Sequence, residues 1–173
     1  MADKKITELT TGVPVSTDYI PYVSSPGSSP ETKKTLVESI SKGYVLFANS
    51  AIFSPTDATA YYFGSLWTYA PTNTDGAQKV FIPVSGVLDR VDISVTIITT
   101  YGSTELSSIY LRKNGTTDYL LSSVFNLSGN AAVNKTGLTV SVTAGDYVEI
   151  KWITPTWATN PAGLLVNATI HVS

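Results

Sequence analysis

Acidic side chains are the residues of this 173-residue chain that could perform acid–base chemistry. Hydrolysis of a glycosidic bond needs two carboxyl groups held about 5–5.5 Å or about 6.5–9.5 Å apart. Beyond residue 44 the carboxylates belong to Asp57, Asp75, Asp89, Asp92, Glu105, Asp118, Asp146 and Glu149. Most of them stand among turn residues, whereas Asp92 and Glu149 lie at the polar phase of alternating segments and are expected to face solvent. We therefore expect no catalytic pair and a protein that is not an enzyme.

Other reactive groups are scarce. The chain has no cysteine and a single histidine, His171, which lies at the polar phase of the last apolar segment. A disulfide framework, a thiolate nucleophile and a cysteine-ligated zinc site are therefore excluded, and one imidazole is too few for a metal site. No EF-hand calcium loop, phosphate-binding glycine loop or Gly-x-Ser-x-Gly elbow is present. We expect neither a metal nor an organic cofactor.

Aromatic side chains are concentrated in one segment. Residues 61–69 read YYFGSLWTY and contain five rings. Because side chains alternate along a strand, five rings cannot all face one core. One of two pairs is then expected on the outer surface: Tyr62 with Trp67, or Tyr61 with Phe63. Such a surface is typical of a subunit contact or of a platform on which sugars stack. Trp157, in the loop 154–163, is also expected to be exposed and to contact a subunit or a ligand.

Charge and hydropathy argue against two classes of partner. The formal net charge is −2 and 14% of residues are charged, so there is no electrostatic basis for binding nucleic acid. The longest apolar run is far below the roughly 18 residues that a membrane span needs. The first ten residues, MADKKITELT, lack the apolar region of a secretory signal. We expect no nucleic-acid partner and no membrane.

The elements that position these residues are predicted to be strands. Nine segments have suitable composition: Tyr44–Phe53, Thr59–Tyr69, Lys79–Val84, Leu88–Thr100, Leu106–Arg112, Tyr119–Phe125, Leu138–Val142, Tyr147–Ile153 and Leu164–Val172. Residues 91–97, VDISVTI, alternate strictly, as in an antiparallel sheet with one solvated face. Asn114-Gly115 predicts a type I′ hairpin. Residues 44–173 are therefore predicted to be a jelly-roll-type antiparallel β-sandwich.

Residues 1–43 have a different pattern. Pro14 and Pro21 favour extended backbone, and residues 24–30, SSPGSSP, are predicted to form a loop. Residues 30–40 are predicted to be a strand that runs into one helical turn. The segment has too few large apolar residues to fold alone. We therefore predict two parts, an extended N-terminal attachment arm at 1–43 and a sandwich head at 44–173.

The arm resembles a known type of leader. MADKKITELT, followed by DYIPYV at 18–23 and ETKKTLVESI at 31–40, resembles a short segment at the start of many bacteriophage virion proteins, including tail fibres, head fibres and capsid decoration proteins. In such proteins the leader is the attachment end and the β-rich remainder projects outward. The resemblance implies particle docking through Ile6, Leu9, Tyr19, Ile20, Tyr22, Val23, Lys33 and Lys34.

The head has a second resemblance. Residues 138–150, LTVSVTAGDYVEI, and 109–115, IYLRKNG, are similar to the strand pair and hairpin of tumour-necrosis-factor-like and complement-type globular heads. Those domains are compact trimeric jelly rolls, so the resemblance implies a homotrimer. The chain departs from them near its end, where their aromatic and glycine signatures are absent.

Together the resemblances imply a phage virion structural protein, assembled in the bacterial cytoplasm and located in the virion. Because the chain is short, we expect a capsid decoration (cement) or head-fibre protein whose arm binds the major capsid protein or another virion protein. The alternative is a small tail fibre or receptor-binding head that contacts host-surface carbohydrate. A polysaccharide-cleaving depolymerase is the least supported, because no carboxylate pattern favours it.

Overall fold

The computed structural model of the protein describes residues 19–24, 31–36, 43–64 and 70–173. The chain divides into two compact units, Met1–Lys42 and Gly43–Ser173. All regular elements of the described residues are strands, paired in antiparallel sheets. Over these residues the structure has no helix that is long and apolar enough to cross a membrane. The prediction of an all-β, antiparallel chain is confirmed for this part of the sequence.

The described residues of the first unit form an antiparallel pair of strands. Strand β1 (Tyr19–Ser24) pairs with β2 (Glu31–Leu36), in a register that runs from Tyr19 opposite Leu36 to Ser24 opposite Glu31. Strand β2 lies within the strand predicted for residues 30–40. The helical turn expected after it lies outside the described residues.

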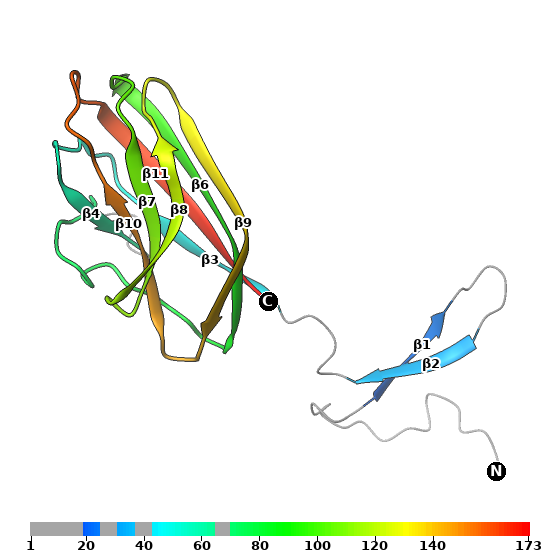
Figure 1. The fold of residues 1–173 in the computed structure, drawn as a ribbon. Helices are drawn as coiled ribbons and strands as arrows, with labels where there is room; N and C mark the ends of the chain where they lie inside the picture. Colours follow the sequence, from blue (N-terminus) through cyan, green and yellow to red (C-terminus); the bar gives the residue numbers. More distant parts are fainter. Residues whose placement is uncertain (1–18, 25–30, 37–42, 65–69) are drawn as a thin grey trace, which may run out of the picture. The chain divides into compact units, whose positions relative to one another are not determined.

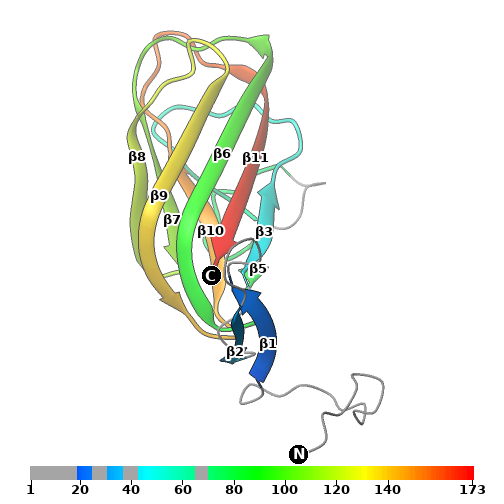
Figure 2. The ribbon, with the colours of Figure 1, turned by 90° about the vertical axis from the view of Figure 1, so that its right-hand side faces the viewer.

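The second unit consists of two sheets packed face to face (Figures 1 and 2). One sheet has the order β4-β10-β7-β8, with β5 also paired to β10, and the other has the order β3-β11-β6-β9. The strands are β3 (Tyr44–Asn49), β4 (Ala60–Phe63), β5 (Val80–Phe81), β6 (Gly86–Thr100), β7 (Ser107–Lys113), β8 (Thr117–Phe125), β9 (Ala131–Val142), β10 (Tyr147–Ile153) and β11 (Ala162–Val172). All nine predicted strands are present, so the coarse prediction of a β-sandwich is consistent with the structure.

Strand pairing in this unit is nested. The first strand, β3, pairs with the last, β11, and moving inward along the chain β4 pairs with β10, β6 with β9 and β7 with β8. Because β3 begins opposite the end of β11, we call that end of the sandwich proximal. The opposite, distal end carries the loops at residues 50–59, 101–106, 126–130 and 154–161, which we call the distal loops.

The core lies between the two sheets and follows the alternation of the strands. In β6 the side chains of Val91, Ile93 and Val95 are at most 2% exposed, while the residues between them face outward. From the other sheet Trp152 fills the interior, and the rings of Phe53 and Phe125 pack edge-on against it with centroids 5.9 and 6.1 Å away. Burial of these apolar side chains is what holds the two sheets together.

Local turn chemistry is also as predicted. Asn114 and Gly115 have φ angles of 50° and 66°, and two successive residues in the left-handed region are what a type I′ turn requires. One boundary differs strongly, because β9 begins at Ala131 rather than Leu138. Residues 134–137, NKTG, are polar or glycine, so a hydropathy pattern does not predict a strand there. Backbone pairing with β6, such as Lys135 opposite Val91, makes this segment a strand.

Candidate functional site

The segment between β4 and β5 covers the outer face of the first sheet. Thr72 exchanges both backbone hydrogen bonds with Tyr62, at 2.7 and 3.1 Å. Farther along, the carbonyl of Gln78 lies so close to Gly64 that a Cβ there would be 1.8 Å from the oxygen. We call residues 70–79 the strap. Because Gly64 has no side chain, the backbone of the strap at Gln78 can lie directly against the sheet.

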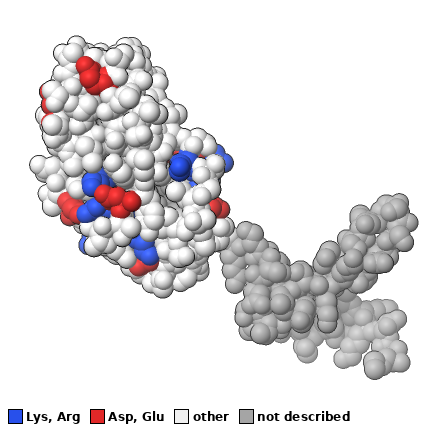
Figure 3. Space-filling model, in the orientation of Figure 1, with Lys and Arg blue, Asp and Glu red and all other residues white. Residues whose placement is uncertain are grey.

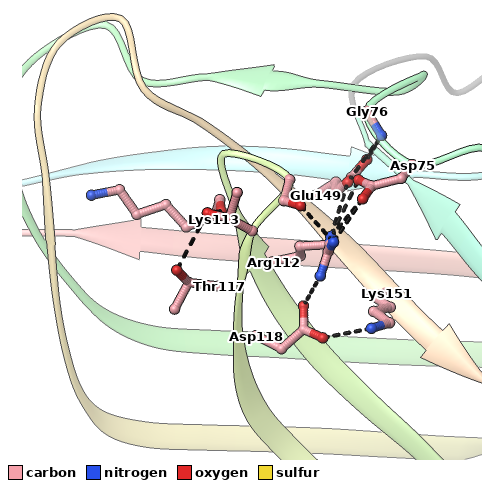
Figure 4. Close-up of polar contacts among 10 residues, drawn as sticks. Asp75, Gly76, Arg112, Lys113, Thr117, Asp118, Glu149 and Lys151 are labelled. Carbon is pink, nitrogen blue, oxygen red and sulfur yellow. Dashed lines mark hydrogen bonds and ion pairs between the residues drawn. The ribbon is translucent and has the colours of Figure 1, made fainter.

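Glu149 is a buried acid beneath the strap. The alternation of β10 predicted a solvated side chain, and that prediction is wrong, because Glu149 is 0% exposed. The strap takes the place of solvent on this face, and the N–H of Gly76 donates to both carboxylate oxygens at 3.2 Å (Figure 4). Burial, together with hydrogen bonding to Asp75, raises the pKa of Glu149 to about 7.

Arg112 of β7 joins the strap to the sheet (Figure 4). Its Nη2 atom lies 2.6 Å from Asp75 Oδ2, and its Nη1 atom lies 2.5 Å from Asp118 Oδ1. Nη2 also donates to the carbonyl of Gly115 at 2.5 Å, and Lys151 Nζ lies 2.5 Å from Asp118 Oδ2. One guanidinium group therefore connects the strap, the β7–β8 turn and β8.

The charges of this cluster set one another's ionisation. Hydrogen bonds from Arg112 lower the pKa of Asp75. Burial alone would raise the pKa of Asp118, but hydrogen bonds from Lys151 and Arg112 outweigh it and the pKa is lowered. Hydrogen bonding to Asp75 raises the pKa of Arg112 in turn. Asp75 and Asp118 therefore stay ionised at neutral pH, whereas Glu149 exchanges its proton near neutrality.

The arrangement is that of a clamp. Each carboxylate of the cluster already has a cation or an N–H as partner. The guanidinium donates from all three of its nitrogens and so holds separate chain segments together. Among the described residues no group of three histidine, aspartate or glutamate side chains is placed to hold a metal ion. The sequence left Asp75, Asp118 and Glu149 as separate surface acids, and the tertiary fold brings them around Arg112.

Two of the predicted aromatic contact residues are buried. Tyr62 is 8% exposed because the strap covers it, and the guanidinium of Arg112 lies 5.9 Å from its ring centre. Trp157 is 4% exposed because its loop folds back over the distal end, where Asp57 accepts its backbone N–H at 3.1 Å. The predictions of exposed rings at Tyr62 and Trp157 are therefore wrong. Trp67 lies outside the described residues.

Most of the predicted docking residues belong to the paired strands of the first unit. Strand β1 contains Tyr19, Ile20, Tyr22 and Val23, and β2 contains Lys33 and Lys34. The register places Tyr22 opposite Lys33. Ile6 and Leu9 lie outside the described residues. Particle docking by this set stays a prediction.

Exposed apolar side chains lie on the outer face of the β3-β11-β6-β9 sheet, which faces the viewer in Figure 2. Phe47 and Val45 of the edge strand β3 are 61% and 41% exposed, and Ile98 of β6 is 55% exposed. Sequence reasoning missed this face, although residues 44–48, YVLFA, carry a usable signal. A strand that is apolar at every position leaves apolar side chains on its outer face.

A polar cluster lies at the middle of the same face. Arg90 Nε and His171 Nε2 lie 2.7 and 3.4 Å from Asp92 Oδ2, and the amide of Asn134 donates to the other carboxylate oxygen. The expected surface position of His171 is confirmed, since its side chain is 36% exposed. Asp92 and Asn134 border a hollow of about 410 Å³. Because these polar groups satisfy one another, little is lost when another protein surface covers them.

The chain was compared with protein-family models and with curated protein sequences. No protein-family model matches it, and no curated protein matches it in sequence. Function must therefore be argued from the geometry described above.

Proposed function

We propose that this protein is a bacteriophage virion structural protein, of the capsid decoration or head-fibre kind. Residues 1–43 attach it to the particle, and residues 44–173 form a projecting homotrimeric jelly-roll head. The partner of the arm is the major capsid protein or another virion protein, and the protein resides in the virion. The function is mechanical and adhesive, and requires no cofactor.

The observation that carries the proposal is the small size of the first unit. Its described strands form a sheet of two, β1 and β2, with no third strand among the described residues. A lone two-stranded hairpin is at best marginally stable in water. A larger protein surface that buries one face of this hairpin would supply the missing stabilisation, as expected for an attachment arm.

The nested strand pairing supports the jelly-roll assignment. Pairing of first with last, second with second-last and so on is what results when one long antiparallel ribbon is rolled into two sheets. The crossings between sheets also leave the termini of the head together at the proximal end, where Tyr44 lies opposite Val172. The distal loops therefore lie at the end of the sandwich remote from Tyr44, where the head begins.

The apolar face of β3 supports the homotrimer. Phe47 lies beside Thr169 and Val45 beside His171 in the strand register, so the apolar edge adjoins the self-satisfied polar cluster. Depletion of unpaired charge around exposed aromatic and aliphatic groups is typical of a subunit contact. Three copies joined through this face would present three arms, and their linkage would multiply the weak grip of each one.

The test uses the parent particle and two forms of the protein. The full chain is expected to co-sediment with particles that lack it, whereas residues 44–173 alone are expected to stay in the supernatant while keeping their sandwich fold. Normal particle binding by residues 44–173 would refute the docking assignment. Copy number separates the two virion locations, since a decoration protein occupies many equivalent sites of the shell and a tail fibre few.

Oligomeric state tests the apolar face separately. Phe47→Asp is expected to convert a trimer into monomers in sedimentation equilibrium, because it places a charge in the contact. Leu106→Asp is the matched control, since Leu106 is also 51% exposed but lies in a distal loop. A monomeric wild-type chain, or a trimer unaffected by Phe47→Asp, would overturn the assignment of this face.

A further inference from the structure

The distal end of the head is nearly free of charge. The four distal loops contain no lysine or arginine, and their acidic residues are Asp57 and Glu105. Each carboxylate accepts one backbone N–H, Asp57 from Trp157 and Glu105 from Ala158. On the face seen in Figure 3 the end of the head remote from the C-terminus marked in Figure 1 shows red atoms but no blue ones, while the blue atoms lie nearer the middle and the other end. Such an end offers no attraction to an anionic partner.

A polar hollow of about 380 Å³ lies at this end, between the last residues of β8 and the first of β9. Its polar lining comes from serine and asparagine side chains, namely Ser122, Asn126, Ser128 and Asn130. The rim is apolar at Val124, which is 69% exposed. Its volume falls within the range of about 300–1,000 Å³ that small-ligand sites occupy.

The two asparagines of the hollow are held in fixed orientations. The side-chain oxygen of Asn126 accepts from the hydroxyl of Ser128 at 2.9 Å, and that of Asn130 accepts from the backbone N–H of Ile97 at 2.8 Å. With each oxygen occupied, the amide N–H₂ group of each side chain is left to donate outward. The structure therefore contains two preorganised neutral donors at the edge of one hollow.

An exposed ring lies on the adjacent loop. The N–H of Gly102 donates to the carbonyl of Leu127 at 2.8 Å, which ties the loop 101–106 to the loop that forms the hollow. Tyr101, the residue before Gly102, is 55% exposed. An exposed ring on a loop hydrogen-bonded to the loop of the hollow suits a ligand that extends beyond the hollow and has both C–H faces and hydroxyl groups.

We infer that this hollow is a binding site for a neutral sugar unit of a surface glycan. The amides of Asn126 and Asn130 donate to sugar hydroxyls, and Val124 with Tyr101 contacts the C–H faces. The inference rests on the proposed projecting head, because the hollow lies at the opposite end of the sandwich from Tyr44, where the head begins. Its test needs no virion, so failure to bind sugar and failure to bind particles are separate results.

The experiment titrates the ¹⁵N-labelled full chain with glucose, galactose and N-acetylglucosamine, each to high millimolar concentration, and follows the side-chain amide signals. A neutral sugar is expected to shift the Asn126 and Asn130 signals saturably. Asn126→Asp and Asn130→Asp keep the oxygen that accepts from Ser128 or Ile97 while removing the outward donor. Because the double variant has no amides at these two positions, its binding is followed through the backbone amide signals of Ser128 and Gly129, which also line the hollow. It is expected to bind at least about tenfold more weakly.

The matched control is Asn160→Asp, which adds the same charge to an exposed distal-loop residue that does not line the hollow. It is expected to bind the sugar as tightly as the wild-type chain, and far-ultraviolet circular dichroism checks the fold of every variant. The inference is overturned if none of the three sugars shifts the two amides, or if the folded double variant binds like the wild-type chain. It is also overturned if Asn160→Asp weakens binding equally.

Discussion

Replacement of Glu149 by glutamine should change how the stability of the protein depends on pH. The pKa of Glu149 is about 7 in the folded state, against 4.5 for an unperturbed glutamate. Between these values the folded chain keeps a proton that the unfolded chain has released. Stability contributed by this group is therefore present below pH 4.5 and is lost as the pH rises toward 7.

The size of the effect follows from the same two values. A difference in pKa between 4.5 and about 7 corresponds to roughly 3 kcal/mol of unfolding free energy. Glutamine at this position has no charge to bury, and its side-chain oxygen can still accept from the N–H of Gly76. The free energy of unfolding of Glu149→Gln, relative to that of the wild-type chain, should therefore rise by roughly 3 kcal/mol from pH 4 to pH 8.

Urea unfolding at a fixed protein concentration, followed by tryptophan fluorescence at several pH values, measures this difference. Other titrating groups largely cancel in the comparison of variant with wild type. Glu105→Gln is the control, because hydrogen bonding to Ser103 lowers the pKa of Glu105 from 4.5, so that its difference from the wild-type chain should stay nearly constant above about pH 5. A wild-type-to-variant difference that stays constant from pH 4 to pH 8, or that changes in the opposite direction, would refute the buried-acid interpretation.

Three further substitutions test the clamp, the buried ring and the hairpin. Arg112→Met should destabilise the fold by about 1–3 kcal/mol, because Asp75 and the Gly115 carbonyl lose their donor while Asp118 keeps Lys151, and thermal unfolding measures it. Trp157→Ala should cost about 3–5 kcal/mol in urea unfolding yet leave the oligomeric state unchanged, whereas a surface contact residue would show the reverse. Gly115→Ala should destabilise the fold by about 1 kcal/mol or more, because φ is 66° and the new Cβ would lie 2.7 Å from the Tyr147 hydroxyl. An unchanged midpoint of urea unfolding would contradict the turn assignment.

Much of the fold was predictable from residues close together in the chain. The nine strands of the head were predicted from their composition, and several of them also from strict apolar alternation. Asn114-Gly115 predicted the hairpin, because a type I′ turn needs left-handed backbone at both positions. The polar start of β9 escaped because pairing with β6, and not hydropathy, makes residues 134–137 a strand. The order of strands in the two sheets was also beyond a local pattern.

The candidate sites depended far more on contacts between distant segments. Alternation indicates the two faces of a strand. It placed Glu149 on an outer face and left Tyr62 as one of two alternatives there, but it carries no information about what covers that face. The strap, joined to the sheet through Arg112, makes both residues buried and moves the ionisation of Glu149 toward neutrality. The direction of a side chain is thus set by its own strand. Its burial and its pKa depend on which distant segment covers that face of the sheet in the folded protein.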